Sequence, residues 1–182
     1  MMAELCLHVI DLVENSVRAR AKNINITLRR SQKADSLEME IGDDGCGMDE
    51  TTVMQVQDPF YTTKSGKKVG LGIPLLKAAA EMTGGSFVLI STAGQGTVVR
   101  SFFILSHIDT PPVGALCDTM LALLVAHAEI NLKFKISTDN NEFTLSTEEI
   151  RQQVGDMHLS HPDILAFLRP YITENLSPMG FS

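Results

Sequence analysis

The chain has 182 residues, of which 44% are hydrophobic and 20% are charged, and its formal net charge is -7. This length accommodates one domain, or one domain with a small appendage, and the composition is that of an ordinary soluble globular protein. The net negative charge is not offset by any cluster of Lys or Arg, which argues against a nucleic-acid partner held through its phosphates.

The cysteines Cys6, Cys46 and Cys117 are far apart and form no C-x-x-C pair, so the sequence indicates neither a disulfide framework nor a zinc site. The N-terminus carries Glu4 and His8 where a signal peptide would need a basic and then an apolar stretch. The longest apolar run, at residues 120–126, is too short to cross a bilayer. We therefore expect a cytoplasmic protein with free thiols and no membrane partner.

Hydrophobic periodicity divides the first part of the chain into helices with a period near 3.6 and strands with a period of two. The expected order is helix, strand, strand, loop-rich segment, helix, strand and strand, at residues 4–21, 23–30, 37–41, 42–69, 72–82, 86–92 and 97–105. This order predicts an α+β fold, a two-layer α/β sandwich in which a mixed sheet carries helices on one face.

Two consecutive prolines, Pro111 and Pro112, mark a boundary, so we expect one domain over residues 1–106 and a small α/β appendage over residues 113–182. The appendage is predicted to begin with a helix at residues 113–128, followed by a β-hairpin of strands 131–137 and 142–145. A short helix is expected after residue 146, and a last helix from about residue 160. Its apolar stripe at residues 121–125 is expected to form a small core of its own, or a docking surface. Ser146 and Glu149 are expected to form a capping box, and Pro170 to interrupt the last helix.

The first helix carries one continuous polar stripe beside its apolar face. Glu4, His8, Asp11, Asn15 and Arg18 line up at helical spacing. A solvated face would also explain the stripe. However, it combines the amide, carboxylate, imidazole and guanidinium groups that bind a metal and a polyphosphate, and it lies where a cleft edge is expected.

A D-x-G-x-G sequence follows the second strand. The alternation of that strand directs Asp43 toward the apolar side, where a carboxylate without a hydrogen-bond donor is costly. An adenine amino group would be a suitable donor, and Gly45 and Gly47 would let the backbone approach a flat base. A plain Asp-Gly turn explains this stretch equally well.

The segment from Asp58 to Gly72 contains D-P-F-Y-T-T-K and G-K-K-V-G-L-G. Glycines directly before a helix leave backbone N–H groups and the positive end of the helix dipole facing a phosphate. Lysines in the same segment suit a lid over a triphosphate. Alone, this loop and the later turn from Gly94 to Thr97 are weak signals.

A helix with Asn, then D-x-G-x-G, D-P-F-x-T-T-K, G-L-G and G-x-G-T, in this order, resembles the histidine-kinase-like ATPase superfamily with the Bergerat fold. Its members include gyrase, mismatch-repair ATPases, sensor histidine kinases, anti-sigma-factor kinases and dehydrogenase kinases. The resemblance covers residues 4–105, and residues 58–105 look most like a sensor histidine kinase. With only three residues before Glu4, no phosphoacceptor helix pair is expected.

The resemblance implies ATP and Mg²⁺ as cofactors. It implies that Asn15 is the Mg²⁺ ligand, that Arg18 contacts phosphate, that Asp43 accepts the adenine amino group, and that Gly47 and Thr97 border the base. The other nucleotide-binding residues expected from it are Gly45, Met48, Phe60, Lys64, Lys68, Gly70, Leu71, Gly72 and Ile73.

Asp11 precedes Asn15 by one helical turn. Superfamily members that attack with water or a serine hydroxyl hold a glutamate there as general base, so a carboxylate favours hydrolysis or Ser/Thr phosphorylation over histidine phosphorylation. Aspartate is one methylene shorter than glutamate. His8 is the second catalytic candidate, able to orient Asp11 or substitute for it, unless it is a satisfied surface histidine.

Three functions remain open at this point. The chain could be a kinase for a partner protein, similar to an anti-sigma-factor or dehydrogenase kinase. It could be an ATP-controlled binding module with weak ATPase activity. It could also be a detached catalytic subunit that phosphorylates a histidine on another chain. Each implies a partner protein as phosphoacceptor or binding target, and a homodimer is compatible with all three.

Overall fold

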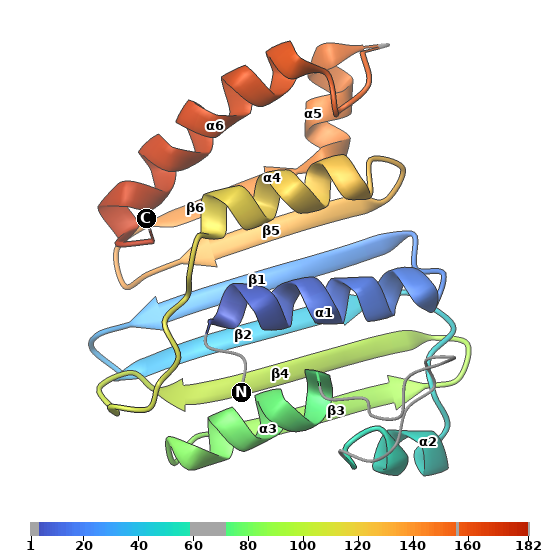
Figure 1. Cartoon of the computed structure of the whole chain (residues 1–182), viewed down its shortest axis with the longest axis vertical. Coiled ribbons are helices and arrows are strands. Elements are labelled where there is room, and N and C mark those ends of the chain that lie inside the picture. The colour runs from blue at the N-terminus through green and yellow to red at the C-terminus, as the bar shows by residue number, and fades with distance from the viewer. Residues whose placement is uncertain (1–3, 59–71, 156, 182) are drawn as a thin grey trace.

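A six-stranded mixed sheet with the order β3-β4-β2-β1-β5-β6 runs through the molecule (Figure 1). This computed structural model describes residues 4–58, 72–155 and 157–181. The strands are β1 (Asn23–Ser31), β2 (Ser36–Asp43), β3 (Ser86–Thr92), β4 (Gly96–Ile104), β5 (Asn131–Ser137) and β6 (Glu142–Ser146). Neighbouring strands are antiparallel, except that β1 and β5 are parallel.

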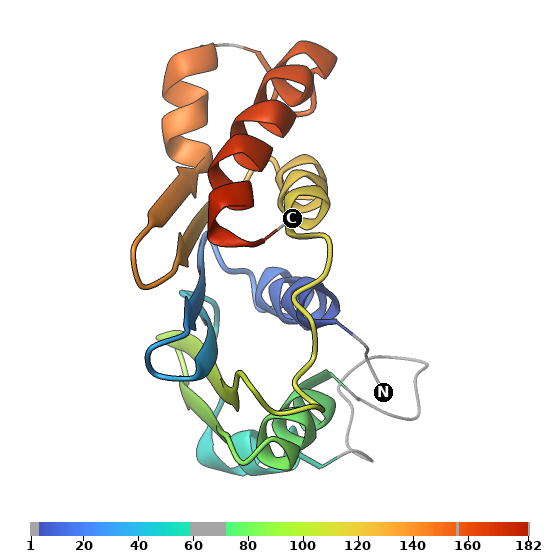
Figure 2. The same ribbon diagram turned by 90° about the vertical axis from the view of Figure 1, so that its left-hand side faces the viewer.

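The helices cover one face of this sheet. They are α1 (Leu5–Arg18), α2 (Glu50–Gln55), α3 (Gly72–Met82), α4 (Leu116–Ala126), α5 (Thr147–Val154) and α6 (Pro162–Leu176), followed by the 3-10 turn η1 (Ser177–Met179). Figure 2 shows α1, α3 and α4 on the same side of the sheet. The α+β sandwich predicted from the sequence is thereby confirmed.

The alternation of β1 produces the packing between sheet and helices. Ile24, Ile26 and Leu28 are each 0% exposed, while the intervening side chains point to the other face. The apolar face of α1 lies on them, with Leu5 and Leu12 buried. Burying one such side chain stabilises the fold by roughly 1.5–3 kcal/mol, so this contact fixes the position of α1 and of its polar stripe.

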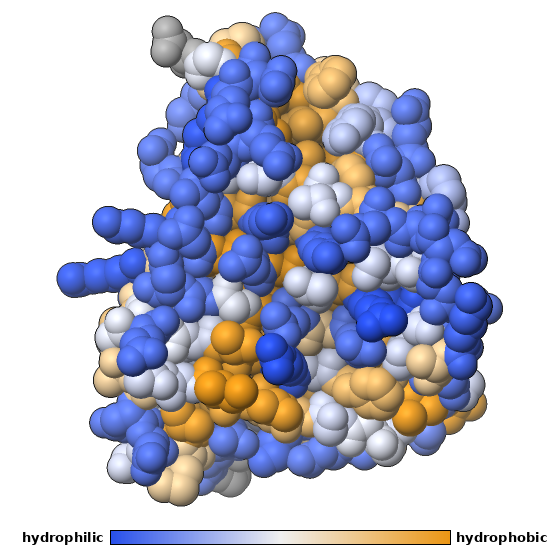
Figure 3. All heavy atoms as spheres, turned by 180° about the vertical axis from the view of Figure 1, so that it is seen from behind, coloured by the Kyte–Doolittle hydropathy of each residue, from blue (hydrophilic) through white to orange (hydrophobic). Residues whose placement is uncertain are grey.

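No helix covers the opposite face of the sheet in the part of the chain that the structure describes (Figures 2 and 3). Hydrophobic side chains gather there over β3 and β4, where Val88 and Ile90 are 43% and 54% exposed. Charged side chains lie beside them, including Arg100, the register partner of Val88, which forms an ion pair with Glu40.

Residues beyond Pro112 extend the same sheet. Strand β5 pairs with β1 in parallel register from Asn23–Asn131 to Arg29–Ser137, and β6 follows β5. Leu121, Leu123 and Leu124 belong to one continuous buried cluster with residues of α1 and β1. The expectation of a separate small core in the tail is therefore wrong, because the tail buries its apolar side chains against the N-terminal part.

Some local expectations also differ from the structure. Helix α2 lies in the segment expected to be loop, and it begins where the Asp49 side chain accepts a hydrogen bond from the Thr52 N–H. Ser146 precedes α5 but makes no capping bond through its side chain, so the expected capping box is not formed.

Helix α6 continues through Pro170 without interruption. Proline removes one N–H donor and leaves the carbonyl of Ala166 without its helical partner. Both residues are exposed, so water can hydrate that carbonyl.

Within the described residues, every helix is too short or too polar to cross a membrane.

Candidate functional site

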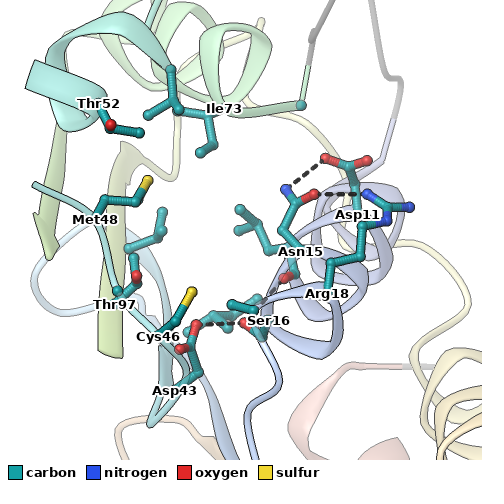
Figure 4. A pocket seen from close by; sticks show the side chains of 17 residues that line it. Asp11, Asn15, Ser16, Arg18, Asp43, Cys46, Met48, Thr52, Ile73 and Thr97 are labelled. Carbon is teal, nitrogen blue, oxygen red and sulfur yellow. Dashed lines mark hydrogen bonds between the residues drawn. The ribbon is translucent and has the colours of Figure 1, made fainter. Parts of the chain in front are cut away.

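A cavity of about 300 Å³ lies between α1, the end of β2, α2 and the start of α3 (Figure 4). This volume is at the lower end of the range for small-molecule sites. The residues predicted from the sequence that line it are Asp11, Asn15, Arg18, Asp43, Gly47, Met48, Gly72, Ile73 and Thr97. The sheet and α1 thus bring together residues that are up to 86 positions apart, as between Asp11 and Thr97.

The polar stripe of α1 forms one wall of the cavity. Asn15 Nδ2 donates to Asp11 Oδ2 at 3.4 Å, and Arg18 Nη1 donates to Asn15 Oδ1 at 3.1 Å (Figure 4). Residues three and four positions apart on a helix are neighbours, so the spacing read from the sequence explains this chain of contacts. The amide oxygen of Asn15 is the atom that could serve as a metal ligand, and here it accepts from Arg18.

Gly72 allows α3 to approach this wall closely. A Cβ atom at this position would overlap the carboxylate of Asp11. The carboxylate therefore lies beside the N-terminus of α3, where the helix dipole favours negative charge. A side chain at residue 72 would therefore separate α1 from α3 at this wall of the cavity.

Asp43 closes the other end of the cavity. Its Oδ2 accepts a hydrogen bond from the Ser16 hydroxyl at 2.6 Å, and its Oδ1 accepts from the Gly45 N–H at 2.8 Å. The sequence indicated that this carboxylate would need a donor, and the chain itself provides two. Gly45 acts through its backbone and is not one of the residues that line the cavity.

A glycine turn forms the wall beside Asp43. Gly47 has a φ of 61°, and a Cβ atom there would overlap the carbonyl of Thr92. The Met48 N–H donates to Ser91 Oγ at 2.8 Å, and the same oxygen lies 2.8 Å from Thr97 Oγ1. These bonds attach the turn to β3 and β4.

His8 is buried behind the polar stripe instead of lying on the surface. It is 1% exposed, and neither ring nitrogen has a hydrogen-bond partner among the described residues. Burial lowers the pKa of His8, while the charge of Asp11 partly offsets this effect. The satisfied surface histidine considered from the sequence is wrong, because the ring is buried and its nitrogens have no partner among the described residues. His8 does not line the cavity.

The remaining predicted residues Phe60, Lys64, Lys68, Gly70 and Leu71 lie outside the described residues. Sequence reasoning missed eight residues that line the cavity, namely Leu12, Ser16, Ala19, Ile41, Cys46, Thr52, Val56 and Val99. Ser16 had a detectable signal, because it is a hydroxyl on the otherwise apolar face of the first helix. Thr52 belongs to the unpredicted helix α2 and Val56 follows it directly.

A magnesium ion at this site would depend on few protein ligands. In the described ranges, no three His, Cys, Asp or Glu side chains gather as a metal site. Asn15 Oδ1 is a neutral oxygen donor on the cavity wall, and Mg²⁺ commonly keeps waters and substrate phosphates as its other ligands. The donor set therefore fits a metal that arrives with a polyphosphate.

The cavity thus has a glycine turn at one end and an Asp-Asn-Arg stripe at the other, on one face of an α+β sandwich. Residues 3–107 match the model of the histidine kinase-, DNA gyrase B- and HSP90-like ATPase family. The chain belongs to this family, which makes it a histidine-kinase-like ATP-binding domain.

Its relatives include sensor and sporulation kinases. It is 35% identical over 109 residues to the sensor protein kinase FleS of Pseudomonas aeruginosa, covering 59% of this chain and 26% of the relative. It is 30% identical over 91 residues to sporulation kinase C of Bacillus subtilis, covering 50% and 21%. The chain thus spans about a quarter or less of the length of these relatives.

A solved structure, the N-terminal domain of a DNA repair protein, shares the fold. The TM-score is 0.55 at 16% sequence identity, and the alignment covers 80% of this chain and 53% of that one. The alignment extends beyond the length of the family match, which covers residues 3–107. Part of the C-terminal region is therefore also shared as fold.

Proposed function

We propose that the chain binds ATP together with Mg²⁺ and transfers the γ-phosphate to a hydroxyl group of a partner protein. The observation that carries this proposal is the position of Asp11. Its carboxylate lines the cavity, contacts Asn15 and lies against Gly72 at the start of α3. A general base must lie within hydrogen-bond reach of the attacking group, and this end of the cavity is where the phosphates would lie.

Each end of the cavity has a part in this reaction. At one end, Asp43 and Thr97 would bind the adenine ring of ATP. At the other end, Asn15 Oδ1 would be a ligand of the metal ion, once the Arg18 side chain has turned to the phosphates. Asp11 takes the proton of the acceptor hydroxyl as the new O–P bond forms and the bond from the γ-phosphorus to the ADP oxygen breaks. Bound Mg²⁺ supplies neutralisation of the phosphate charge.

The lid residues complete the site by resemblance. The backbone of Gly70 and Leu71 would contact phosphate, Lys64 and Lys68 would add positive charge, and Phe60 would border the nucleotide. His8 is proposed to support Asp11 from behind and not to act as the base, because it is 1% exposed and lies outside the cavity lining.

The test is Asp11→Asn, which keeps the size of the side chain and removes the base. With radiolabelled ATP and extracts of the host as acceptor, we expect phosphate transfer to fall by about 10²-fold or more. ATP affinity, measured by calorimetry, should change by less than about threefold. Asp109→Asn, at an exposed loop position, is the matched control and should leave both values unchanged. Undiminished transfer by Asp11→Asn would contradict the assignment.

A second candidate is a catalytic subunit that phosphorylates a histidine on another chain. The observation that favours it is the similarity to sensor and sporulation kinases. The chemical stability of the product separates the two candidates: a phosphoserine or phosphothreonine survives acid, whereas a phosphohistidine does not. Tight ATP binding without transfer or hydrolysis would instead indicate an ATP-controlled binding module.

A further inference from the structure

Ser16 makes a contact that the family resemblance did not predict. Its side chain points from the apolar face of α1 toward the end of β2, and the residue is 4% exposed. Its Oγ lies 2.6 Å from Asp43 Oδ2 and 3.2 Å from the carbonyl oxygen of Leu12 (Figure 4). A hydroxyl has one hydrogen to donate. The shorter contact, to a carboxylate, is the stronger of the two, so the hydrogen is directed to Asp43.

We propose that Ser16 is a specificity-determining residue of the nucleotide site, because it holds the Asp43 carboxylate in an orientation that accepts a 6-aminopurine and rejects a 6-oxopurine. This inference rests on the proposed nucleotide site and adds to it the residue that sets base selectivity.

The bonds around Asp43 carry the argument. Each carboxylate oxygen has room for two hydrogen bonds. Ser16 occupies one position on Oδ2, and the Gly45 N–H occupies one on Oδ1 at 2.8 Å. Ser16 Oγ, having given its hydrogen to Asp43, has only lone pairs left. Every free position on this pair of side chains is therefore an acceptor.

The two classes of purine respond differently to such a surface. The 6-amino group of adenine donates and can be satisfied by one acceptor. The 6-oxo group of hypoxanthine or guanine presents lone pairs to lone pairs, and an unpaired buried acceptor is costly. Sites of this kind can reject the wrong partner far more strongly than an apolar pocket does.

Guanine could in principle bind in another way, with its N1–H and 2-amino group donating side by side to both oxygens of one carboxylate. This fork requires the carboxylate to turn its two oxygens toward the base together. The bonds from Ser16 and Gly45 hold the two oxygens separately, and turning would break at least one of them. Without the Ser16 hydroxyl, only the Gly45 bond would resist the turn.

The experiment compares the affinities of the full chain for ATP, ITP and GTP by calorimetry, for wild type and for Ser16→Ala. ITP isolates the 6-position, because its base lacks the 2-amino group. We expect Ser16→Ala to weaken ATP binding about 5–10-fold and to lower the ATP-to-ITP affinity ratio about tenfold, as expected for loss of one charge-assisted hydrogen bond. Ser16→Thr keeps the hydroxyl and should keep most of the wild-type ratio.

Ser101→Ala is the matched control. Ser101 is also buried, at 3% exposed, and its Oγ has no hydrogen-bond partner among the described residues. It does not line the cavity, so this variant should retain the wild-type ratio. If Ser16→Ala does not fold, Ser16→Cys replaces it, since a thiol is a weaker donor of similar size and should lower the ratio to a lesser extent.

An unchanged ATP-to-ITP affinity ratio in Ser16→Ala or its substitute, together with a lowered melting temperature, would overturn the inference. Ser16 would then have only a structural role, in which its hydrogen bond links α1 to β2. Failure of the wild-type chain to bind ATP, ITP or GTP would instead refute the proposed nucleotide site, and this inference with it. The two failures are distinguished by the wild-type titration alone.

Discussion

Arg18 donates a hydrogen bond to the amide oxygen of Asn15, the same atom that is proposed to hold Mg²⁺. Because Arg18 is a cation, it cannot share that oxygen with a metal ion at close range. The two contacts must exclude each other. A polyphosphate would provide Arg18 with a stronger partner than an amide, and this exchange would release Asn15 Oδ1 for the metal. In the proposed site, the side chains of α1 would therefore couple the arrival of phosphate to the formation of the metal site.

The burial of His8 predicts a measurable pH dependence of stability. Its pKa in the folded protein is lowered, chiefly because burial disfavours the charged ring. The unfolded chain therefore binds a proton more readily than the folded chain. The contribution of His8 to the free energy of unfolding is fully present above the ordinary histidine pKa near 6.5, and it is lost as the pH falls below that value. We expect His8→Leu to reduce the loss of unfolding free energy between pH 7.5 and 5.5 by up to about 1 kcal/mol.

Denaturant titrations at both pH values measure this difference. His158→Leu is the matched control, because it makes the same substitution at a side chain that is 59% exposed. An equal loss of stability in wild type and His8→Leu would show that the buried ring does not govern the acid side of the stability curve.

At the scale of elements, α6 combines an apolar stripe with a proline in its interior. Ile164, Leu168 and Ile172 are buried along one side, and Pro170 lies on the exposed side. The stripe supplies enough burial to continue the helix past the missing hydrogen bond. Proline in a helix interior still costs about 3 kcal/mol relative to alanine.

Pro170→Ala should therefore stabilise the protein. Alanine restores the N–H donor to the carbonyl of Ala166, but it also increases the entropy of the unfolded chain, which offsets about 1 kcal/mol. We expect a net gain of about 1–2 kcal/mol in the free energy of unfolding, measured by urea titration. Pro162→Ala is the control and should give no gain, because proline at the start of a helix is favourable. A loss of stability in Pro170→Ala would mean that the proline shapes a bend the packing requires.

The strands were predictable to within a residue or two because their alternation reports burial directly. Residues 86–92 and 131–137 were expected as strands and are β3 and β5. The short helix α2 was not predictable in the same way, since it has no buried residue and therefore no apolar period. Asp43 followed from the alternation of β2. The hydroxyl of Ser16 on an apolar helix face indicated a buried polar contact, but periodicity could not show that its partner would be Asp43.

At the scale of the whole molecule, β1 connects the nucleotide site with the C-terminal region. It pairs with β2, which carries Asp43 at its end, on one side and with β5 on the other. Glu14, the neighbour of Asn15, also accepts a hydrogen bond from Nε2 of His127, the residue directly after α4, at 2.8 Å. The pairing of β1 with β5 could not be predicted from the sequence, because periodicity defines strands but not which strands become neighbours.

This arrangement predicts that the C-terminal region and the nucleotide site unfold together. Phe134 of β5 is 1% exposed, and it is paired in register with Ile26 of β1. Phe134→Ala should lower the free energy of unfolding by about 3–5 kcal/mol, since it leaves a cavity in the shared core.

The chain contains no tryptophan, so far-UV circular dichroism and binding of a fluorescent ATP analogue are the two probes. Both should lose their signal at the same urea concentration, which should be lower than in the wild type. Phe167→Ala is the control. Phe167 is 68% exposed, so its replacement should shift the midpoint of unfolding only slightly. Two separate transitions, with nucleotide binding retained after the C-terminal region has unfolded, would show instead that residues 113–182 are an independent module attached to the edge of the sheet.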